Sequence, residues 1–225
     1  MVCVQAASDQ TTVELKLSQG TRRYDYAYQV LDLVNQERAK KNLSPVTMDK
    51  NLLECAMTRA EELTVYASHN RPNGSSCFSA FPYFADSSEN LAINQSTPEE
   101  VMETWVKSSG HYANIINSSN VSAGIGCYSQ NGHLYWIQCF TSHKAETCTQ
   151  PANQNVSPVI SALPDLVDLH FDASSPVLKF HDRTLAEGKD YAISFSNNQN
   201  SGLGSFTITG LGFYSGTLTN NFFIR

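Results

Sequence analysis

The sequence predicts an α+β protein in which a three-layer α/β/α sandwich precedes a small all-β module. In the first part of the chain, apolar residues recur at helical spacing and are followed by a strong hairpin signal. The second strand of that hairpin, residues 134–140, is apolar on both faces, which is typical of a strand covered on both sides. Toward the C-terminus the pattern is β throughout. We therefore expect an N-terminal segment (1–23), an α/β domain (24–142), a linker (143–158) and a β-sandwich module (159–225).

Three helices are expected in the α/β domain. The first covers residues 24–41, and the second covers residues 49–66 with Asp49 as its N-cap. The third begins at Thr97-Pro98-Glu99-Glu100, where threonine caps the helix, proline takes the first helical position and Glu100 can close a capping box. It is expected to stop at Ser108-Ser109-Gly110, before a short helical turn over 111–116.

Asn131-Gly132 is the hairpin signal, and it joins expected strands over 123–129 and 134–141. Residues 70–88 contain Pro72, Gly74 and Pro82 and are expected to form a loop. In the C-terminal module, β-rich runs alternate with Asn/Gly turns and predict strands over 191–196, 204–209 and 216–224.

Charge and hydropathy argue against two classes of partner. The formal net charge is −6, and neither part of the chain carries the basic face that phosphate neutralisation demands, so no nucleic-acid partner is expected. No stretch approaches the ~18 apolar residues of a transmembrane helix, so no membrane span is expected.

Six cysteines without a CxxC pair favour disulfides and an oxidising compartment, although buried small hydrophobes would give the same sequence. Cys139 and Cys148 flank a short polar loop after a strand and are the leading candidate pair.

Val4-Gln5-Ala6-Ala7 resembles the end of a signal peptide, and a disordered terminus is the alternative. The expected location is extracellular or at the cell surface.

The residues that can do chemistry stand in a few short segments of the α/β domain, namely residues 68–74, 88–92, 105–115, and 124–128 with 135–138. The order and spacing of these segments resemble the bacterial branch of the CAP superfamily, whose SCP-like domain occurs in cysteine-rich secretory proteins. The resemblance covers about residues 24–142. It implies an α/β/α sandwich with a cleft that holds two histidines and two glutamates.

By position, His69 and His111 match the two histidines of the family, and Glu89 matches the first glutamate. Ser88 stands where the family has a glycine, and Ser108 stands at the position of the second glutamate. Neutral imidazoles bind zinc and similar ions, and a carboxylate can ligate, orient a histidine or act as a base. The resemblance therefore implies a site for zinc or another divalent metal ion, formed by His69, His111 and Glu89.

Ser108, Arg71 and Asn90 are expected to line the cleft. Arg71 is either an anchor of its loop or a charge at the rim, and Asn90 is expected to bond backbone. A nucleophile pair of Ser108 and His111 is not expected, because no acid follows in a recognised arrangement and no G-x-S-x-G turn is present.

The C-terminal segments 188–198 and 204–216 resemble the Ig-like repeat modules of bacterial surface proteins, of which this chain has one copy. The resemblance implies a spacer, or a module that contacts the cell wall or a surface glycan through residues 159–225. A folded cap without a binding role is the alternative.

Three classes of function remain open at this point. The first, which we favour, is a secreted or cell-surface protein whose cleft binds a divalent metal ion and/or a small-molecule, apolar or lipid ligand. The second is a metal-dependent, peptidase-like hydrolase with Glu89 as general base. The third is a structural or adhesive surface protein. The serine at the second glutamate position favours the first class, because hydrolysis usually requires a proton-transfer residue beside the metal ligands.

Overall fold

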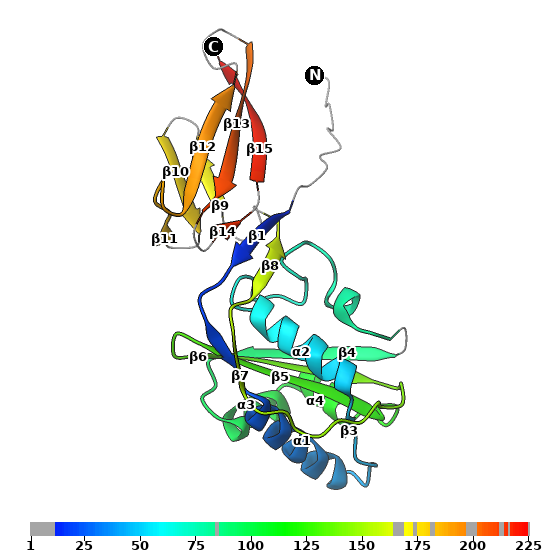
Figure 1. The fold of residues 1–225 in the computed structure, drawn as a ribbon. Helices are drawn as coiled ribbons and strands as arrows, with labels where there is room; N and C mark the ends of the chain where they lie inside the picture. The colour runs from blue at the N-terminus through cyan, green and yellow to red at the C-terminus, as the bar shows by residue number, and fades with distance from the viewer. Residues whose placement is uncertain are drawn as a thin grey trace, which may run out of the picture. The chain divides into compact units, whose positions relative to one another are not determined.

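The structure is a computed structural model that describes residues 12–83, 86–163, 169–172, 175–180, 183–196, 202–211, 214–215 and 217–224. The chain divides into two compact units (Figure 1). The larger comprises residues 18–71 and 75–158, and the smaller comprises residues 1–17, 72–74 and 159–225. The predicted signal-peptide end at residues 4–7, with Cys3, lies outside the described residues.

The larger unit is built on a sheet with the strand order β4-β6-β5-β2-β7. Its centre is the predicted hairpin of β5 (Ser122–Gln130) and β6 (His133–Thr141). Asn131 and Gly132 at the turn have φ angles of 52° and 83°, the positive values that a type I′ turn requires. The other strands are β2 (Gly20–Arg22), β4 (Ser87–Ile93), β7 (Gln154–Val156) and β3 (Thr47–Met48), which pairs with β5 in parallel.

Four strands of this unit, β2, β3, β4 and β7, lie where the sequence predicts none. β4 includes the motif around Glu89 and pairs with β6 along one edge of the sheet. β7 lies inside the predicted linker 143–158 and pairs with β2, so residues 154–156 belong to the sheet, and the linker prediction is corrected there. β7 is short and largely exposed, and it therefore lacks the apolar alternation that reveals a strand.

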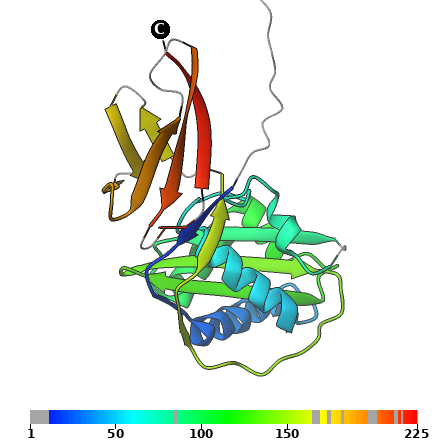
Figure 2. The same ribbon diagram turned by 45° about the horizontal axis from the view of Figure 1, so that its top comes forward.

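The helices are α1 (Tyr24–Ala39), α2 (Lys50–Glu62), α3 (Pro98–Lys107) and α4 (Ser109–Ile115), with a 3₁₀ turn η1 at Cys77–Ala80. Figure 1 shows α2 against one face of the sheet and α1 and α3 against the other, and Figure 2 shows α1 (blue) and α2 (cyan) on opposite sides from a second direction. The mixed α/β architecture predicted for this unit is confirmed. Thr97 caps α3 as predicted, accepting a bond from the Glu100 amide.

The approach of α2 to the sheet depends on two glycines of β5. A Cβ atom on Gly124 would overlap the carbonyl oxygen of Leu52, and one on Gly126 would overlap that of Ala56. The backbone of α2 therefore lies directly on this part of β5, where any side chain would hold it away.

Asp49 fixes the start of α2. Its buried carboxylate accepts from the Leu52 amide at 2.8 Å, from the Glu146 amide at 2.7 Å and from the Tyr83 hydroxyl at 3.0 Å.

We expect Asp49→Ala to lower the free energy of unfolding by about 1–3 kcal/mol, since these donors lose their acceptor. Urea denaturation measures the change. Asp49→Asn keeps an acceptor for the cap, so its free energy of unfolding should lie between those of Asp49→Ala and wild type. Equal stability of Asp49→Ala and wild type would contradict the prediction.

The cysteine prediction requires a correction. None of the described cysteines, Cys55, Cys77, Cys127, Cys139 and Cys148, is bonded to another in this structure, so the predicted pair of Cys139 and Cys148 is not found. Cys139 packs in the core cluster that contains Ala56 and Ala60 of α2. Cys148 lies against α1, with its Sγ 3.3 Å from the hydroxyl of Tyr28. The two thiols pack in different clusters, although few residues separate them in the chain.

In the part that the structure describes, the smaller unit has antiparallel strands in three sheets. The first sheet contains β1 (Val13–Lys16), β8 (Val159–Ala162) and β14 (Tyr214–Ser215); the second β9 (Leu169–Asp172), β10 (Ser175–Phe180) and β11 (Arg183–Thr184); the third β12 (Tyr191–Ser196), β13 (Gly202–Gly210) and β15 (Thr217–Ile224). The strands predicted over 191–196 and 204–209 are present, as is most of the one over 216–224. The assignment of an N-terminal segment over 1–23 is corrected, because β1 pairs within this unit and β2 within the other. The Ig-like classification stays a prediction.

Candidate functional site

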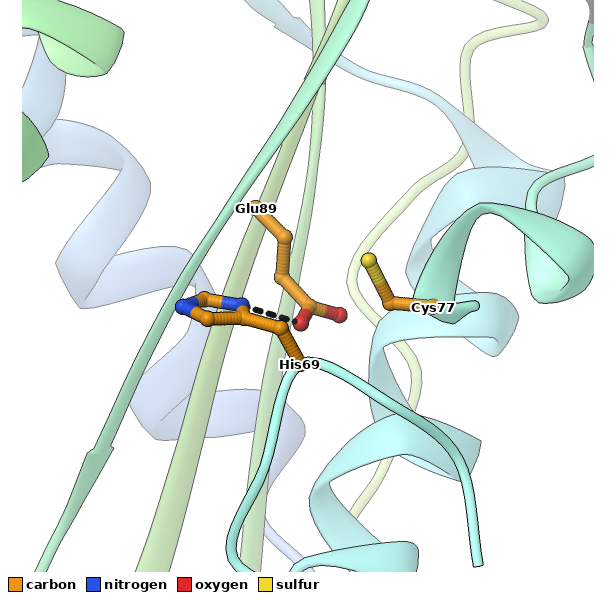
Figure 3. Close-up of side chains that lie close together, drawn as sticks. All are labelled: His69, Cys77 and Glu89. Carbon is orange, nitrogen blue, oxygen red and sulfur yellow. Dashed lines mark hydrogen bonds and ion pairs between the residues drawn. The ribbon is translucent and has the colours of Figure 1, made fainter. Parts of the chain in front are cut away.

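The core of the site is a hydrogen bond between His69 and Glu89. His69 lies in the loop after α2, and Glu89 lies on the edge strand β4; His69 Nδ1 is 2.9 Å from Glu89 Oε1 (Figure 3). The His69 side chain is 55% exposed and the Glu89 side chain 1% exposed. An ionised carboxylate only accepts hydrogen bonds, so Nδ1 carries the proton and Nε2 keeps a free lone pair. Figure 3 shows this second nitrogen pointing away from Glu89.

Arg59 of α2 holds Glu89 in place. Its Nε donates to Glu89 Oε2 at 2.9 Å, and its Nη1 donates to Glu62 Oε2 at 2.6 Å. Nη2 donates to the carbonyl of Ser68, beside His69, at 2.8 Å. Burial opposes the charge of Arg59, but Glu89 and then Glu62 outweigh it and raise the pKa of the guanidinium. Glu89 is thus anchored on one side while it orients His69 on the other.

Arg71 extends this network by one more ion pair. Its Nη2 donates to Glu62 Oε1 at 2.6 Å, and its Nε donates to the same oxygen at 2.9 Å. Its Nη1 reaches Ser79 Oγ at 3.3 Å. These contacts support the first of the two predicted roles, an anchor of the loop that carries His69.

Asn90 ties α4 to the edge strand. Its Nδ2 donates to the carbonyl of His111 at 3.0 Å and to Gln138 Oε1 at 2.9 Å, and its Oδ1 accepts from Asn114 at 2.8 Å. Asn90 is fully buried and supports the backbone of His111. Its place as a cleft-lining residue stays a prediction.

His111 lies close enough to His69 to respond to its charge. Burial first, and then the charge of His69, lower the pKa of His111. His111 is therefore neutral at neutral pH, which is the form that binds a metal ion. Among the described residues, its buried Nδ1 finds no hydrogen-bond partner, and neither does Ser88 Oγ on β4. Buried polar atoms without partners are rare in folded proteins, and they suit a place where a ligand or ion binds.

β4 is an edge strand that contacts α2 on one of its sides and α4 on the other. Side chains alternate along a strand, so Glu89 points toward α2 and Asn90 toward α4. His69 follows α2, and His111 belongs to α4. The two histidines approach the same strand from its two sides.

Cys77 lies beside the carboxylate of Glu89, on the side away from the imidazole of His69 (Figure 3). Ligand atoms of His69, Cys77 and Glu89 lie within 4.8 Å of one another (Figure 3). Burial first, and then the charge of Glu89, raise the pKa of Cys77 to about 11, so the thiol stays protonated at neutral pH. A thiolate is the form that ligates metal, and Nδ1 is already used by Glu89. Of the two ring nitrogens of His69, Nε2 is therefore the one left for a further ligand.

Ser108 forms the junction of α3 and α4. Its amide donates to the carbonyl of Trp105 at 3.2 Å, and its carbonyl accepts from the Tyr112 amide at 2.8 Å. Its place in the cleft stays a prediction.

Sequence reasoning missed Arg59, Glu62 and Cys77. One signal was present: Arg59 lies three residues after Ala56 and seven after Leu52, at the spacing of the buried stripe of α2. A charged residue in such a stripe needs a buried partner. The sequence does not indicate that this partner is Glu89.

The larger unit is similar in sequence to known proteins. Residues 31–140 match the model of the family described as CAP, the cysteine-rich secretory protein family. The protein YkwD of Bacillus subtilis (strain 168) is 35% identical over 121 residues, which cover 51% of this chain and 46% of YkwD. The chain thus spans about half the length of this curated relative.

Several solved structures are similar at lower identity. An extracellular protein with an SCP domain from Bacillus anthracis str. Ames is 23% identical, with a TM-score of 0.48 over 52% of this chain and 40% of that chain. An outer surface protein of Borrelia burgdorferi is 19% identical, with a TM-score of 0.48 over 54% and 94% of the two chains. A cysteine-rich secretory protein of Staphylococcus aureus subsp. aureus Mu50 is 16% identical, with a TM-score of 0.43 over 53% and 38%. Residues 31–140 of the larger unit are thus similar to the CAP, or cysteine-rich secretory protein, family.

Proposed function

We propose that this protein is an extracytoplasmic binding protein whose CAP domain holds a divalent metal ion, such as zinc, between His69 and His111. One observation carries the proposal. His69 is oriented by a buried carboxylate so that its free Nε2 is available, and a neutral His111 with an unpaired buried ring nitrogen lies near it. A carboxylate that accepts the other ring proton of a histidine is typical of metal-binding histidines.

In this proposal Glu89 is a positioning residue. Arg59 engages both carboxylate oxygens, at 2.9 and 3.3 Å, and His69 engages one of them. Glu89 therefore fixes the ring of His69 and selects its tautomer. A bound ion with two protein ligands would offer further coordination positions to an oxygen or nitrogen atom of a small ligand.

The same contacts weigh against a hydrolase in which Glu89 activates water. A general base must reach the proton that it removes, and Glu89 is buried and saturated by Arg59 and His69. The two readings are separated by a screen of peptide, ester and glycan substrates with and without zinc. Zinc-dependent turnover that disappears in Glu89→Gln would favour the hydrolase.

We expect His69→Ala and His111→Ala each to weaken zinc binding by about 100-fold or more, because each removes one of two protein ligands. Glu89→Gln should weaken it less, by about 10–100-fold, because the amide still accepts from His69. Isothermal titration calorimetry of the full chain at neutral pH measures the affinities, and circular dichroism checks the fold.

His133→Ala is the matched control. His133 is an exposed histidine beside the hairpin turn, with Nδ1 2.8 Å from Asn94 Oδ1. Its loss should leave the affinity unchanged. Wild-type affinity in both His69→Ala and His111→Ala would refute the metal site and leave a binding or structural domain without a metal.

The location of the protein and the role of residues 159–225 belong to the same proposal. None of the described helices is long and apolar enough to span a membrane. We keep the predicted roles of the C-terminal unit as a spacer or as a contact to the cell wall or a surface glycan. Binding of the full chain to isolated cell wall, compared with the chain ended at residue 158, tests the second role.

A further inference from the structure

We propose that Cys55 of α2 and Cys139 of β6 form a disulfide bond when the protein folds in an oxidising compartment. The bond would tie α2 to the central hairpin. The proposal depends on the packing of α2 against the sheet and does not depend on a metal ion at His69.

The first step concerns the direction of Cys139. In the register of the sheet, Cys139 lies opposite Gly124 of β5 on one side and opposite Glu89 of β4 on the other. Residues directly opposite each other across paired strands point to the same face. Gly124 faces the Leu52 carbonyl, and Glu89 binds Arg59, so this face is the one covered by α2. Cys139 therefore points at α2.

The second step concerns the position of Cys55 on the helix. Cys55 comes three residues after Leu52 and four before Arg59, and residues at these spacings lie on one face of a helix. Leu52 lies over Gly124, and Arg59 reaches Glu89. Along the helix Cys55 lies between these two contacts, and across the sheet Cys139 lies between Gly124 and Glu89. The two cysteines therefore face each other.

The third step is the environment of the two thiols. Both belong to the same buried core cluster, with Cys55 7% and Cys139 0% exposed. Burial first, and then the neighbouring Cys55 thiol, raise the pKa of Cys139. The glycines of β5 let the backbone of α2 lie directly on the sheet. A disulfide needs such a close approach, because it joins Cα atoms that are only about 4.4–6.8 Å apart.

The other described cysteines have different neighbours. Cys127 belongs to the cluster around α1 and Trp136, Cys148 contacts Tyr28, and Cys77 lies beside Glu89. None of them belongs to the cluster of Cys55 and Cys139.

The chemistry is thiol–disulfide exchange with an external disulfide, such as oxidised glutathione or the disulfide of a thiol oxidase. One cysteine thiolate attacks that disulfide, forms a mixed disulfide and releases one thiolate. The second cysteine, as a thiolate, attacks the mixed disulfide and displaces the other half. The two cysteines lose two protons and two electrons in total, and the external disulfide is reduced to two thiols. Because Cys139 is fully buried in the folded protein, we place the exchange before the core closes.

The test is oxidative refolding of the full chain in a mixture of reduced and oxidised glutathione. Free thiols are then alkylated, and the protein is digested with chymotrypsin, since Tyr128, Tyr135 and Trp136 separate Cys127 from Cys139. We expect mass spectrometry to find Cys55 linked to Cys139. The melting temperature should exceed that of the reduced protein by on the order of 5–10 °C, because the bond closes a long loop.

Cys55→Ala and Cys139→Ala should each abolish this difference between the oxidised and reduced melting temperatures. Cys127→Ala is the matched control, because it removes a buried thiol of the other cluster. It should keep the Cys55–Cys139 bond and the difference between the oxidised and reduced melting temperatures. Alkylated, unlinked Cys55 and Cys139 in the refolded wild type, or a predominant link from either one to another cysteine, would overturn the proposal. The wild-type peptide map decides this even if a variant fails to fold.

Discussion

Arg59→Met is expected to lower the free energy of unfolding by about 3–5 kcal/mol, which is the usual cost of removing one partner from a buried ion pair. The substitution keeps most of the side-chain volume and removes only the charge. It leaves Glu89 buried without a cation and leaves Glu62 with Arg71 as its remaining partner. The carbonyl of Ser68 also loses its donor. Urea denaturation followed by circular dichroism measures the change.

The control for this prediction is Arg23→Met. Arg23 is also paired with a carboxylate, Asp25, at 2.8 Å, but both side chains are partly exposed. Water replaces such a pair at little cost, so we expect Arg23→Met to lower the free energy of unfolding by less than about 1 kcal/mol. Similar decreases in the free energy of unfolding in Arg59→Met and Arg23→Met would contradict the view that burial makes the Arg59 network important for stability.

The Arg59 network also predicts an effect on the site that is separate from stability. Arg59→Lys retains a positive charge but cannot donate to Glu62, Glu89 and Ser68 with one planar group. We expect a folded variant in which the carboxylate of Glu89 is held less firmly, and zinc binding at His69 should then weaken. Unchanged zinc affinity in a folded Arg59→Lys variant would show that Glu89 does not need this anchor.

Gly126→Ala is expected to destabilise the protein by about 1–3 kcal/mol or more, through overpacking between β5 and α2. The added methyl group would overlap the carbonyl oxygen of Ala56, which is backbone and cannot rotate away. The helix would have to move from the sheet and open the cluster that contains Cys55, Ile137 and Cys139. Thermal and urea unfolding measure this loss.

Gly110→Ala is the matched control. Gly110 lies in α4, and a Cβ atom there would meet no other heavy atom within 4 Å. Alanine favours the helix more than glycine does, so this variant should be as stable as wild type or more stable by about 0.5–1 kcal/mol. If Gly126→Ala were also as stable as wild type, α2 could not lie as close to β5 as described.

Caps and turn residues in the sequence correctly predicted the helix starts and the hairpin turn, because these features depend on neighbouring residues. The α2 cap at Asp49, the α3 start at Thr97 and the Asn131-Gly132 turn are decided by bonds and φ angles within a few residues. The resemblance to a known family placed Glu89, and the structure puts it against His69.

The sequence by itself determined the mixed α/β domain and the β-rich C-terminal unit, because periodicity, caps and turns depend on near neighbours. The candidate site residues came from the resemblance to a known family. Only the tertiary structure decided which residues lie beside each other across layers. It paired Arg59 with Glu89, placed Cys139 in the α2 cluster and Cys148 against α1, and brought β7 to the sheet edge. These outcomes depend on how closely α2 lies on two glycines of β5 and on hydrogen bonds between distant segments. Neither cause leaves a periodic signal along the chain.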